Sequence, residues 1–132
     1  KTHKLWIDKF GIRILQGYGT VETAPMLSLN SPMNFKKDSL GCLLPSIDHK
    51  TIPVDGVDKG GRLLVSGPNV MLGYMTHDKP GILQPTIAGE STSTSFQAPT
   101  GGGKKYWHDT GDIAHVDERG FVFLVKSSAA FC

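Results

Sequence analysis

The chain has 132 residues, of which 39% are hydrophobic and 20% charged, and its formal net charge is +2. This length supports one domain with a modest core, and the net charge is too small to argue for a nucleic-acid or acidic-membrane partner. The 16 Gly and 8 Pro exceed what a helical bundle tolerates and favour short strands joined by tight turns.

The first predicted element is a short helix that begins near Thr2, which can cap it, and ends at Gly11. The stretch Ile12-Arg13-Ile14-Leu15 follows, and it is typical of a buried strand in a parallel sheet. We therefore expect residues 1–24 to be the helix–strand–turn tail of an α/β nucleotide-binding subdomain, because such sheets bind ligands at strand ends. The unpaired edge of that strand predicts a dimer.

The rest of the chain, residues 25–132, is predicted to be β-rich. Two pairs of apolar stretches, within 47–66 and 113–125, flank glycine-containing turns and predict hairpins. Strands at this spacing indicate a small, distorted β-barrel. The expected fold class is therefore mainly β, with a β-barrel-like subdomain preceded by the helix–strand remnant of an α/β sheet. Within the barrel, a Ser-, Thr- and Gly-rich stretch near 86–105 predicts a mobile loop.

Cysteine and histidine usage gives a further expectation. Cys42 and Cys132 lie far apart and form no Cys-x-x-Cys pair, which favours free thiols in a reducing compartment over a disulfide. We therefore expect this part of the protein to be cytoplasmic. The five histidines show no metal-ligand spacing with cysteines or carboxylates, so the sequence gives little support to a zinc site.

The first polar turn reads Gly-Tyr-Gly-Thr-Val-Glu-Thr. Gly17 and Gly19 let the backbone approach a ligand closely, and the Tyr18 ring between them offers a flat stacking face. Thr20 supplies a hydroxyl, while Glu22 supplies a carboxylate that could hold Mg²⁺ beside a phosphate. The alternative is a tight turn with a hydrogen-bonded tyrosine and a solvated glutamate, which the residue types alone do not exclude.

A second polar turn, at 106–112, reads Tyr-Trp-His-Asp-Thr-Gly-Asp and lies directly before an apolar stretch. A fixed carboxylate at Asp112 could accept two hydrogen bonds from the vicinal hydroxyls of a ribose. The alternative is a hairpin entry in which Asp112 caps a turn. We expect the two turns to face one nucleotide site.

In this order, the two turns resemble the Tyr-Gly-x-Thr-Glu and Tyr/Trp-x-x-Thr-Gly-Asp segments of the adenylate-forming superfamily. This superfamily includes acyl-CoA synthetases, luciferases and nonribosomal-peptide adenylation domains. The resemblance covers nearly the whole chain, and the intervening segments that share it include Gly61-Arg62-Leu63, Gly67-Pro68-Asn69-Val70-Met71 and Gly73-Tyr74. Within the superfamily, the chain is most similar to the acyl-[acyl-carrier-protein] synthetase part of 2-acylglycerophosphoethanolamine acyltransferases, through features that include Asn30-x-Pro32-Met33 and Lys79-Pro80-Gly81-Ile82-Leu83.

Enzymes of this kind join a carboxylate to ATP, form an acyl-adenylate and pyrophosphate, and then pass the acyl group to a thiol. The resemblance implies a set of site residues: Thr20 and Glu22 as catalytic, and Gly17, Tyr18, Gly19 and Asp112 as cofactor-binding. It further implies that Glu22 ligates Mg²⁺ and that Asp112 binds the ribose of ATP. Two positions depart from the family pattern, because its Thr before the Glu aligns with Val21, and the Arg expected after Val125 is absent.

The implied function is a fragment of an ATP- and Mg²⁺-dependent fatty acid ligase that passes the acyl group to acyl-carrier protein in phospholipid acylation. A lysophospholipid would then be an acceptor in the parent protein, at the cytoplasmic face of the inner membrane. Two alternatives stay open: a long-chain acyl-CoA ligase fragment that uses coenzyme A, and a non-catalytic β-barrel interaction module. Because the family's upstream phosphate loop and carboxyl-terminal domain are not in this sequence, we expect the isolated chain to be inactive.

Overall fold

The computed structural model of the chain describes residues 2–84 and 107–126. The mobile loop expected near 86–105 lies outside these residues, as does the tail after Lys126. In chain order the elements are α1 (Thr2–Phe10), β1 (Gly17–Tyr18), the 3₁₀ turn η1 (Val21–Thr23), β2 (Ser28–Leu29), β3 (Cys42–Leu43), β4 (Asp48–Ile52), β5 (Gly61–Ser66), β6 (Tyr74–Met75), β7 (Leu83–Gln84), β8 (His108–Val116) and β9 (Val122–Lys126). More of the described residues lie in strands than in helices, which confirms the mainly-β fold class. Across these elements, no helix has the length and apolar character needed to cross a membrane.

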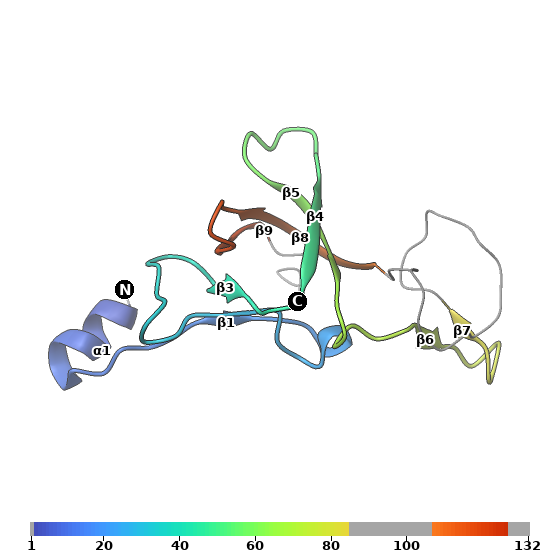
Figure 1. Ribbon diagram of the computed structural model, residues 1–132, viewed down its shortest axis with the longest axis horizontal. Coiled ribbons are helices and arrows are strands. Elements are labelled where there is room, and N and C mark those ends of the chain that lie inside the picture. The colour runs from blue at the N-terminus through green and yellow to red at the C-terminus, as the bar shows by residue number, and fades with distance from the viewer. Residues whose placement is uncertain (1, 85–106, 127–132) are drawn as a thin grey trace.

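The strands form three small antiparallel sheets. The largest has the order β4-β5-β8-β9, a second has the order β1-β2-β3, and β6 pairs with β7 (Figure 1). Both predicted hairpins are present, because β4 pairs with β5 and β8 with β9. In the described part of the chain, the expected barrel is therefore a set of small, distorted sheets and not one closed cylinder.

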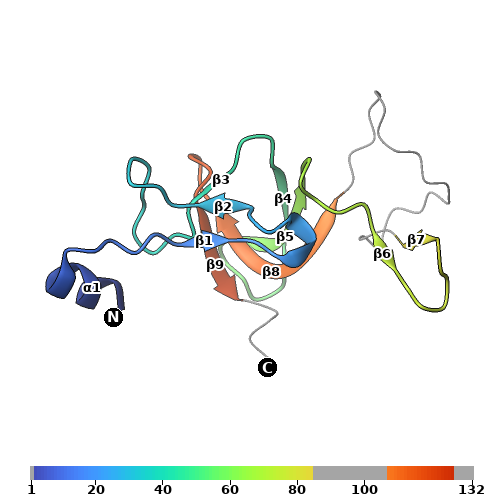
Figure 2. The same cartoon turned by 90° about the horizontal axis from the view of Figure 1, so that it is seen from below.

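The two larger sheets meet where β3 approaches β9. The backbone N–H of Leu40 donates to the Val122 carbonyl at 2.8 Å, and the N–H of Leu43 donates to the Gly120 carbonyl at 2.9 Å. Figure 2 shows β1 and β2 crossing in front of β5, β8 and β9. The largest sheet and the connecting loops form one buried cluster: Leu27, Leu63, Val65, Val70, Ala114 and Val122. From the second sheet, the partly buried Tyr18 and Leu43 pack against this cluster.

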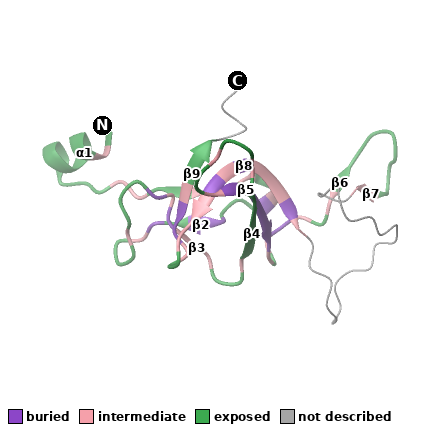
Figure 3. Ribbon diagram, turned by 90° about the horizontal axis from the view of Figure 1, so that it is seen from above, coloured by how far each residue is buried: buried purple, intermediate pink, exposed green. Residues whose placement is uncertain are grey.

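The amino-terminal helix lies apart from this core. α1 spans the predicted residues, and Gly11 ends it with a left-handed φ of +64°. None of its residues is buried, and Figure 3 shows it as an exposed arm at one end of the molecule. The strand predicted at 12–15 is wrong, since these residues form no strand and Ile12 is 50% exposed. A strand needs a neighbour to pair its backbone groups, and among the described residues none pairs with this run.

Backbone pairing crosses the boundary that we expect near residue 24. Tyr18 of β1 pairs with Ser28 of β2, and the Leu27 N–H donates to the Tyr18 carbonyl at 2.8 Å. The first polar turn is therefore attached to the β-rich part of the chain. The division into residues 1–24 and 25–132 stays a prediction.

Candidate functional site

The first polar turn is closed by a tight contact at Gly19. A Cβ atom on Gly19 would lie 1.5 Å from the Pro25 carbonyl oxygen, so only glycine fits there. The buried Thr23 completes the turn, because its Oγ1 accepts the Thr20 N–H at 3.0 Å and lies 2.9 Å from the same Pro25 oxygen. The inner side of the turn is thus packed and hydrogen-bonded, whereas the Val21 side chain is 91% exposed.

The second polar turn belongs to strand β8, from His108 onward, where the strand bulges. Residues 110–112 together face the single residue Leu63 of β5. Within the bulge, Gly111 has a φ of +73°, a conformation that costs glycine little. The Thr110 hydroxyl donates to the Leu63 carbonyl at 2.9 Å and accepts the Asp112 N–H at 3.2 Å. Since β-bulges re-aim side chains beside functional sites, this bulge explains how Asp112 leaves the regular ladder.

The two polar turns meet at Tyr18 and Asp112, which are 94 positions apart in the sequence. The Tyr18 hydroxyl donates to Oδ2 of Asp112 at 2.7 Å, and Asp112 is 6% exposed. Burial raises the pKa of Tyr18 well above its usual value, and the Asp112 carboxylate raises it further. The phenol therefore stays protonated at neutral pH and keeps donating. The expected approach of the two turns is observed, while the nucleotide itself stays a prediction.

Glu22 has a partner that the sequence did not reveal. The Tyr74 hydroxyl donates to Oε1 of Glu22 at 2.9 Å, and the Met71 N–H donates to the Glu22 carbonyl at 2.8 Å. A hydrogen bond from the Glu22 main chain, followed by the bond from Tyr74, lowers the pKa of the Glu22 carboxyl. The site therefore presents a partly exposed carboxylate that is ionised at neutral pH.

This carboxylate fits a magnesium ion of the kind that is held mainly by water and substrate phosphates. Mg²⁺ in phosphate-binding sites is commonly ligated by only one or two protein carboxylates. Among residues 2–84 and 107–126, no group of three or more His, Cys, Asp or Glu side chains gathers to hold a metal ion. Within the described residues, Glu22 is the carboxylate that would hold such an ion.

Two further residues near the turns also escaped the sequence reasoning. The Asn69 side-chain amide donates to the carbonyls of Thr23 and Met26, at 2.6 Å and 2.8 Å. His108 is 5% exposed, and its Nδ1 atom has no hydrogen-bond partner in the part of the chain that the structure describes. The sequence Gly67-Pro68-Asn69 predicts a loop. The contact of Asn69 with the first polar turn is tertiary, however, and no local sequence pattern predicts it.

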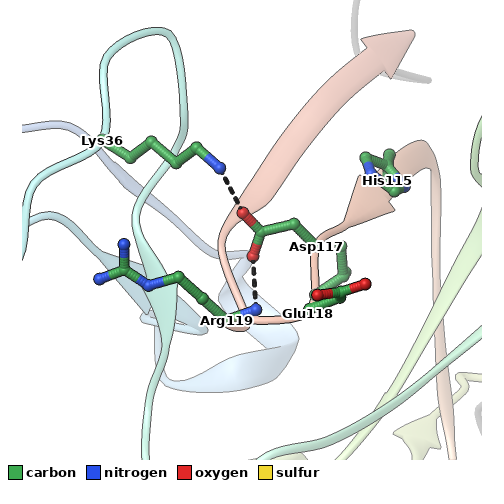
Figure 4. A pocket seen from close by; sticks show the side chains of 6 residues that line it. Lys36, His115, Asp117, Glu118 and Arg119 are labelled. Carbon is green, nitrogen blue, oxygen red and sulfur yellow. Dashed lines mark hydrogen bonds and ion pairs between the residues drawn. The ribbon is translucent and has the colours of Figure 1, made fainter.

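A separate hollow of about 430 Å³ opens beside the β8–β9 turn (Figure 4). Its lining consists mainly of charged side chains: Lys36, His115, Val116, Asp117, Glu118 and Arg119. Lys36 Nζ lies 2.6 Å from Asp117 Oδ2, and this contact lowers the pKa of Asp117. The same ammonium lies 5.2 Å from the centroid of the Phe123 ring. Because its central charges pair with each other and it contains no residue of the polar turns, we place the candidate site at the turns.

Comparison with known proteins adds independent information. No family model matches the chain. A curated long-chain-fatty-acid–CoA ligase from Escherichia coli is 33% identical to it over 125 residues, which cover 91% of this chain and 19% of that protein. The chain thus spans about a fifth of the length of the curated relatives it matches.

Solved structures agree with this similarity. A long-chain-fatty-acid–CoA ligase from Archaeoglobus fulgidus superimposes with a TM-score of 0.64 and 25% identity, covering 96% of this chain and 25% of that one. An O-succinylbenzoate–CoA synthetase from Bacillus subtilis, solved with ATP and a magnesium ion, shares the fold at a TM-score of 0.61 and 24% identity, covering 93% and 23%. The homologues and structural neighbours of the chain are AMP-binding acyl-CoA ligases of the adenylate-forming superfamily.

Proposed function

We propose that this chain forms one side of the nucleotide site of an AMP-forming acid–CoA ligase, as part of a longer protein that activates a fatty acid. The observation that carries the proposal is the hydrogen bond between Tyr18 and Asp112. It joins two segments that match the superfamily in sequence and that lie far apart along the chain. The similarity to a long-chain-fatty-acid–CoA ligase supports a fatty acid and coenzyme A as the substrates.

In this proposal the nucleoside lies against the two turns. Asp112 is fixed by the bulge and by Tyr18, so it can accept hydrogen bonds from the ribose hydroxyls without first being ordered. The Tyr18 side chain, with Gly17 and Gly19 beside it, borders the adenine. Tyr18 then has two tasks, since its hydroxyl also orients the carboxylate that holds the sugar.

The phosphates lie on the Glu22 side of the site. The Glu22 carboxylate ligates Mg²⁺, which neutralises phosphate charge when it is bound, and the Thr20 hydroxyl contacts a phosphate oxygen. Val21 occupies the position of the family's threonine and is 91% exposed, so the neighbouring Thr20 supplies the hydroxyl of this turn.

The reaction that follows is acyl transfer in two steps. The fatty acid carboxylate attacks the α-phosphorus of ATP, an acyl–phosphate bond forms, and pyrophosphate leaves. The sulfur of the thiol acceptor then attacks the acyl carbon and releases AMP. Residues of this chain contribute positioning and charge stabilisation to the first step.

The thiol that accepts the acyl group is the most specific part of the proposal. Coenzyme A is our first proposal, since the curated relative is named for it. Acyl-carrier protein and a lysophospholipid, implied by the subfamily resemblance, stay predictions, as do a dimer and a cytoplasmic location. Acyl transfer by the full-length protein to coenzyme A, compared with transfer to acyl-carrier protein, separates the two thiols.

Calorimetric titration of a non-hydrolysable acyl-adenylate analogue into the purified chain tests the proposal. We expect the wild type to bind and Asp112→Asn to bind much more weakly, because an amide cannot accept both ribose hydrogen bonds. Asp117→Asn is the matched control, since Asp117 lies in the hollow at the β8–β9 turn. Equal binding by the wild type and Asp112→Asn, or equal loss in both variants, would overturn the ribose contact. No binding by the wild type would confine this chain to a structural role in a site that forms only in the longer protein.

A further inference from the structure

Asp109 is an acidic residue of the second polar turn to which the proposed function assigns no role. It lies one position before the bulge at 110–112, and its Oδ1 accepts the Gly111 N–H at 2.9 Å. Thr110 makes the equivalent bond one residue later, because its hydroxyl oxygen accepts the Asp112 N–H at 3.2 Å. The bulge is thus built from two consecutive bonds in which a side chain accepts the N–H two residues further on.

Both of these side chains are also held by the neighbouring strand β5. The Thr110 hydroxyl donates to the Leu63 carbonyl, and Arg62 Nε lies 2.9 Å from Oδ1 and 2.7 Å from Oδ2 of Asp109. In the strand ladder Arg62 faces Ile113, which follows the bulge, while its side chain reaches Asp109, which precedes the bulge. The ion pair therefore spans the bulge and connects its two ends.

The functional side chain that this arrangement carries is Asp112. Its carboxylate accepts the Tyr18 hydroxyl at 2.7 Å, and its backbone lies within the bulge. Hydrogen bonds weaken steeply away from their preferred directions, so the direction of this carboxylate decides how well it can accept from a ribose. Tyr18 holds the carboxylate end of the side chain, whereas the position of its backbone depends on the bulge.

We propose that Asp109 is a positioning residue, which holds the bulge together with Arg62 and thereby orients the Asp112 carboxylate toward the ribose hydroxyls of the bound nucleotide. This inference rests on the proposed function. Asp109 acts through Asp112 and not by contact with the ligand. An exposed ion pair by itself adds little to the free energy of unfolding, but a carboxylate that accepts a backbone N–H makes a charge-assisted bond, which fixes the local conformation. The effect of Asp109 is therefore expected in the recognition of the ribose.

Titration of AMP and of dideoxy-AMP, which lacks both ribose hydroxyls, into the full-length protein that carries this chain tests the inference. Asp109→Leu removes the acceptor of the Gly111 N–H, whereas Asp109→Asn keeps an acceptor oxygen and loses only the charge. We expect Asp109→Leu to weaken AMP binding about tenfold, the usual effect of losing a hydrogen bond to a charged group. Asp109→Asn should recover most of this loss, and dideoxy-AMP should bind all three proteins equally.

Asp117→Leu is the matched control, because Asp117 makes the same two kinds of contact elsewhere. Its Oδ1 accepts the N–H of the residue two positions further on, Arg119, at 2.9 Å, and its Oδ2 lies 2.6 Å from Lys36 Nζ. It lines the separate hollow at the β8–β9 turn. Asp117→Leu should therefore bind AMP like the wild type.

Unchanged AMP affinity in Asp109→Leu would overturn the inference. An equal loss of AMP and dideoxy-AMP binding would also overturn it, because the substitution would then act on the whole site and not on the ribose contact. A wild-type protein that binds both compounds equally would instead overturn the ribose contact on which this inference rests, and one that binds neither would overturn the proposed function itself.

Discussion

The helix α1 and the strand β5 both carry apolar side chains, yet only the strand buries them. β5 lies between β4 and β8, and Leu63 and Val65 are fully buried. In α1 no residue is buried, and Phe10 is 61% exposed. An apolar pattern therefore favours a local conformation, helix or strand. Whether its side chains become buried depends on which other segments pack against them, and the pattern does not specify those segments.

The two polar turns belong to the packed region. The first turn is closed against Pro25, the second is a bulge hydrogen-bonded to Leu63, and a further hydrogen bond links the two. Candidate ligand-binding groups are therefore held by the same contacts that hold the core. This coupling predicts that substitutions at the turns disturb stability far more than substitutions in α1.

The largest expected difference in the free energy of unfolding is between alanine substitutions of two glycines, Gly19 and Gly11. In Gly19→Ala the new methyl group would overlap the Pro25 carbonyl, and we expect a loss above the usual range for overpacking, about 1–3 kcal/mol, because backbone must move. In Gly11→Ala nothing lies within 4 Å of the new Cβ, and the left-handed φ costs only about 1–2 kcal/mol. Urea unfolding followed by circular dichroism measures both. Equal losses would show that the first turn is no better packed than the helix end.

A second pair compares side-chain truncations. Leu27→Ala removes a fully buried side chain and should cost about 3 kcal/mol of unfolding free energy. Phe10→Ala removes an exposed ring and should change it by less than about 0.5 kcal/mol. Thermal denaturation of both variants gives the comparison. A large effect of Phe10→Ala would reveal a partner for α1.

The third prediction breaks the link between the two turns. Tyr18→Phe removes the donor to the buried Asp112, and losing a hydrogen bond to a charged group costs about 2 kcal/mol. Chemical denaturation at neutral pH measures the change. Tyr74→Phe, which loses an exposed bond to Glu22, is the matched tyrosine substitution. If Tyr18→Phe were no more destabilising than Tyr74→Phe, the bond to Asp112 would not hold the turns together.

The same tyrosine makes a prediction about pH. Burial, aided by Asp112, raises the folded-state pKa of Tyr18, whereas an unfolded tyrosine ionises near pH 10. The stabilisation from the neutral phenol is complete below about pH 10 and is lost as the pH rises from there through the folded pKa. Unfolding free energy should therefore fall less steeply above about pH 10 in Tyr18→Phe than in the wild type. Parallel slopes would contradict the burial of this group.

The smallest expected effect concerns Glu22. Tyr74→Phe should raise the pKa of the Glu22 carboxyl toward its ordinary value of 4.5, because one of the bonds that lower it is lost. The lowered pKa stabilises the fold above that ordinary value, and this contribution disappears as the pH falls through the folded pKa. Since the pair is exposed, the free energy should change by less than about 0.5 kcal/mol. Carbon-detected NMR titration of the carboxyl follows the shift, and an unmoved pKa would remove Tyr74 from the site.

What the sequence could predict depended on the range of the interaction. Both hairpins and α1 follow from turn residues, caps and apolar spacing, which act over a few positions. The stretch at 12–15 misled because its three apolar residues fit a buried strand only if a neighbouring strand exists to pair with it.

The site divides in the same way. The chemistry of Glu22 and Asp112 follows from residue type, and the meeting of the two turns could be predicted because both motifs belong to one superfamily pattern. The Tyr74 contact, the buried His108 and the bulge at 110–112 could not, because each arises when segments distant in sequence pack together. The local sequence Thr-Gly-Asp is compatible with a bulge within a strand and with a turn between strands, so it does not distinguish the two.

The number of residues in the bulge at 110–112 determines which insertions and deletions β8 can accept without reversing its side chains. Three residues stand opposite one, so β8 carries two extra residues, and an even number leaves the in-and-out alternation of a strand unchanged. His108 before the bulge, Asp112 within it and Ala114 after it are all buried. A two-residue insertion of this kind can add polar chemistry to an existing strand while the parity of everything downstream is kept. Gain or loss of a single residue there would move every later side chain of β8 to the opposite face of the sheet.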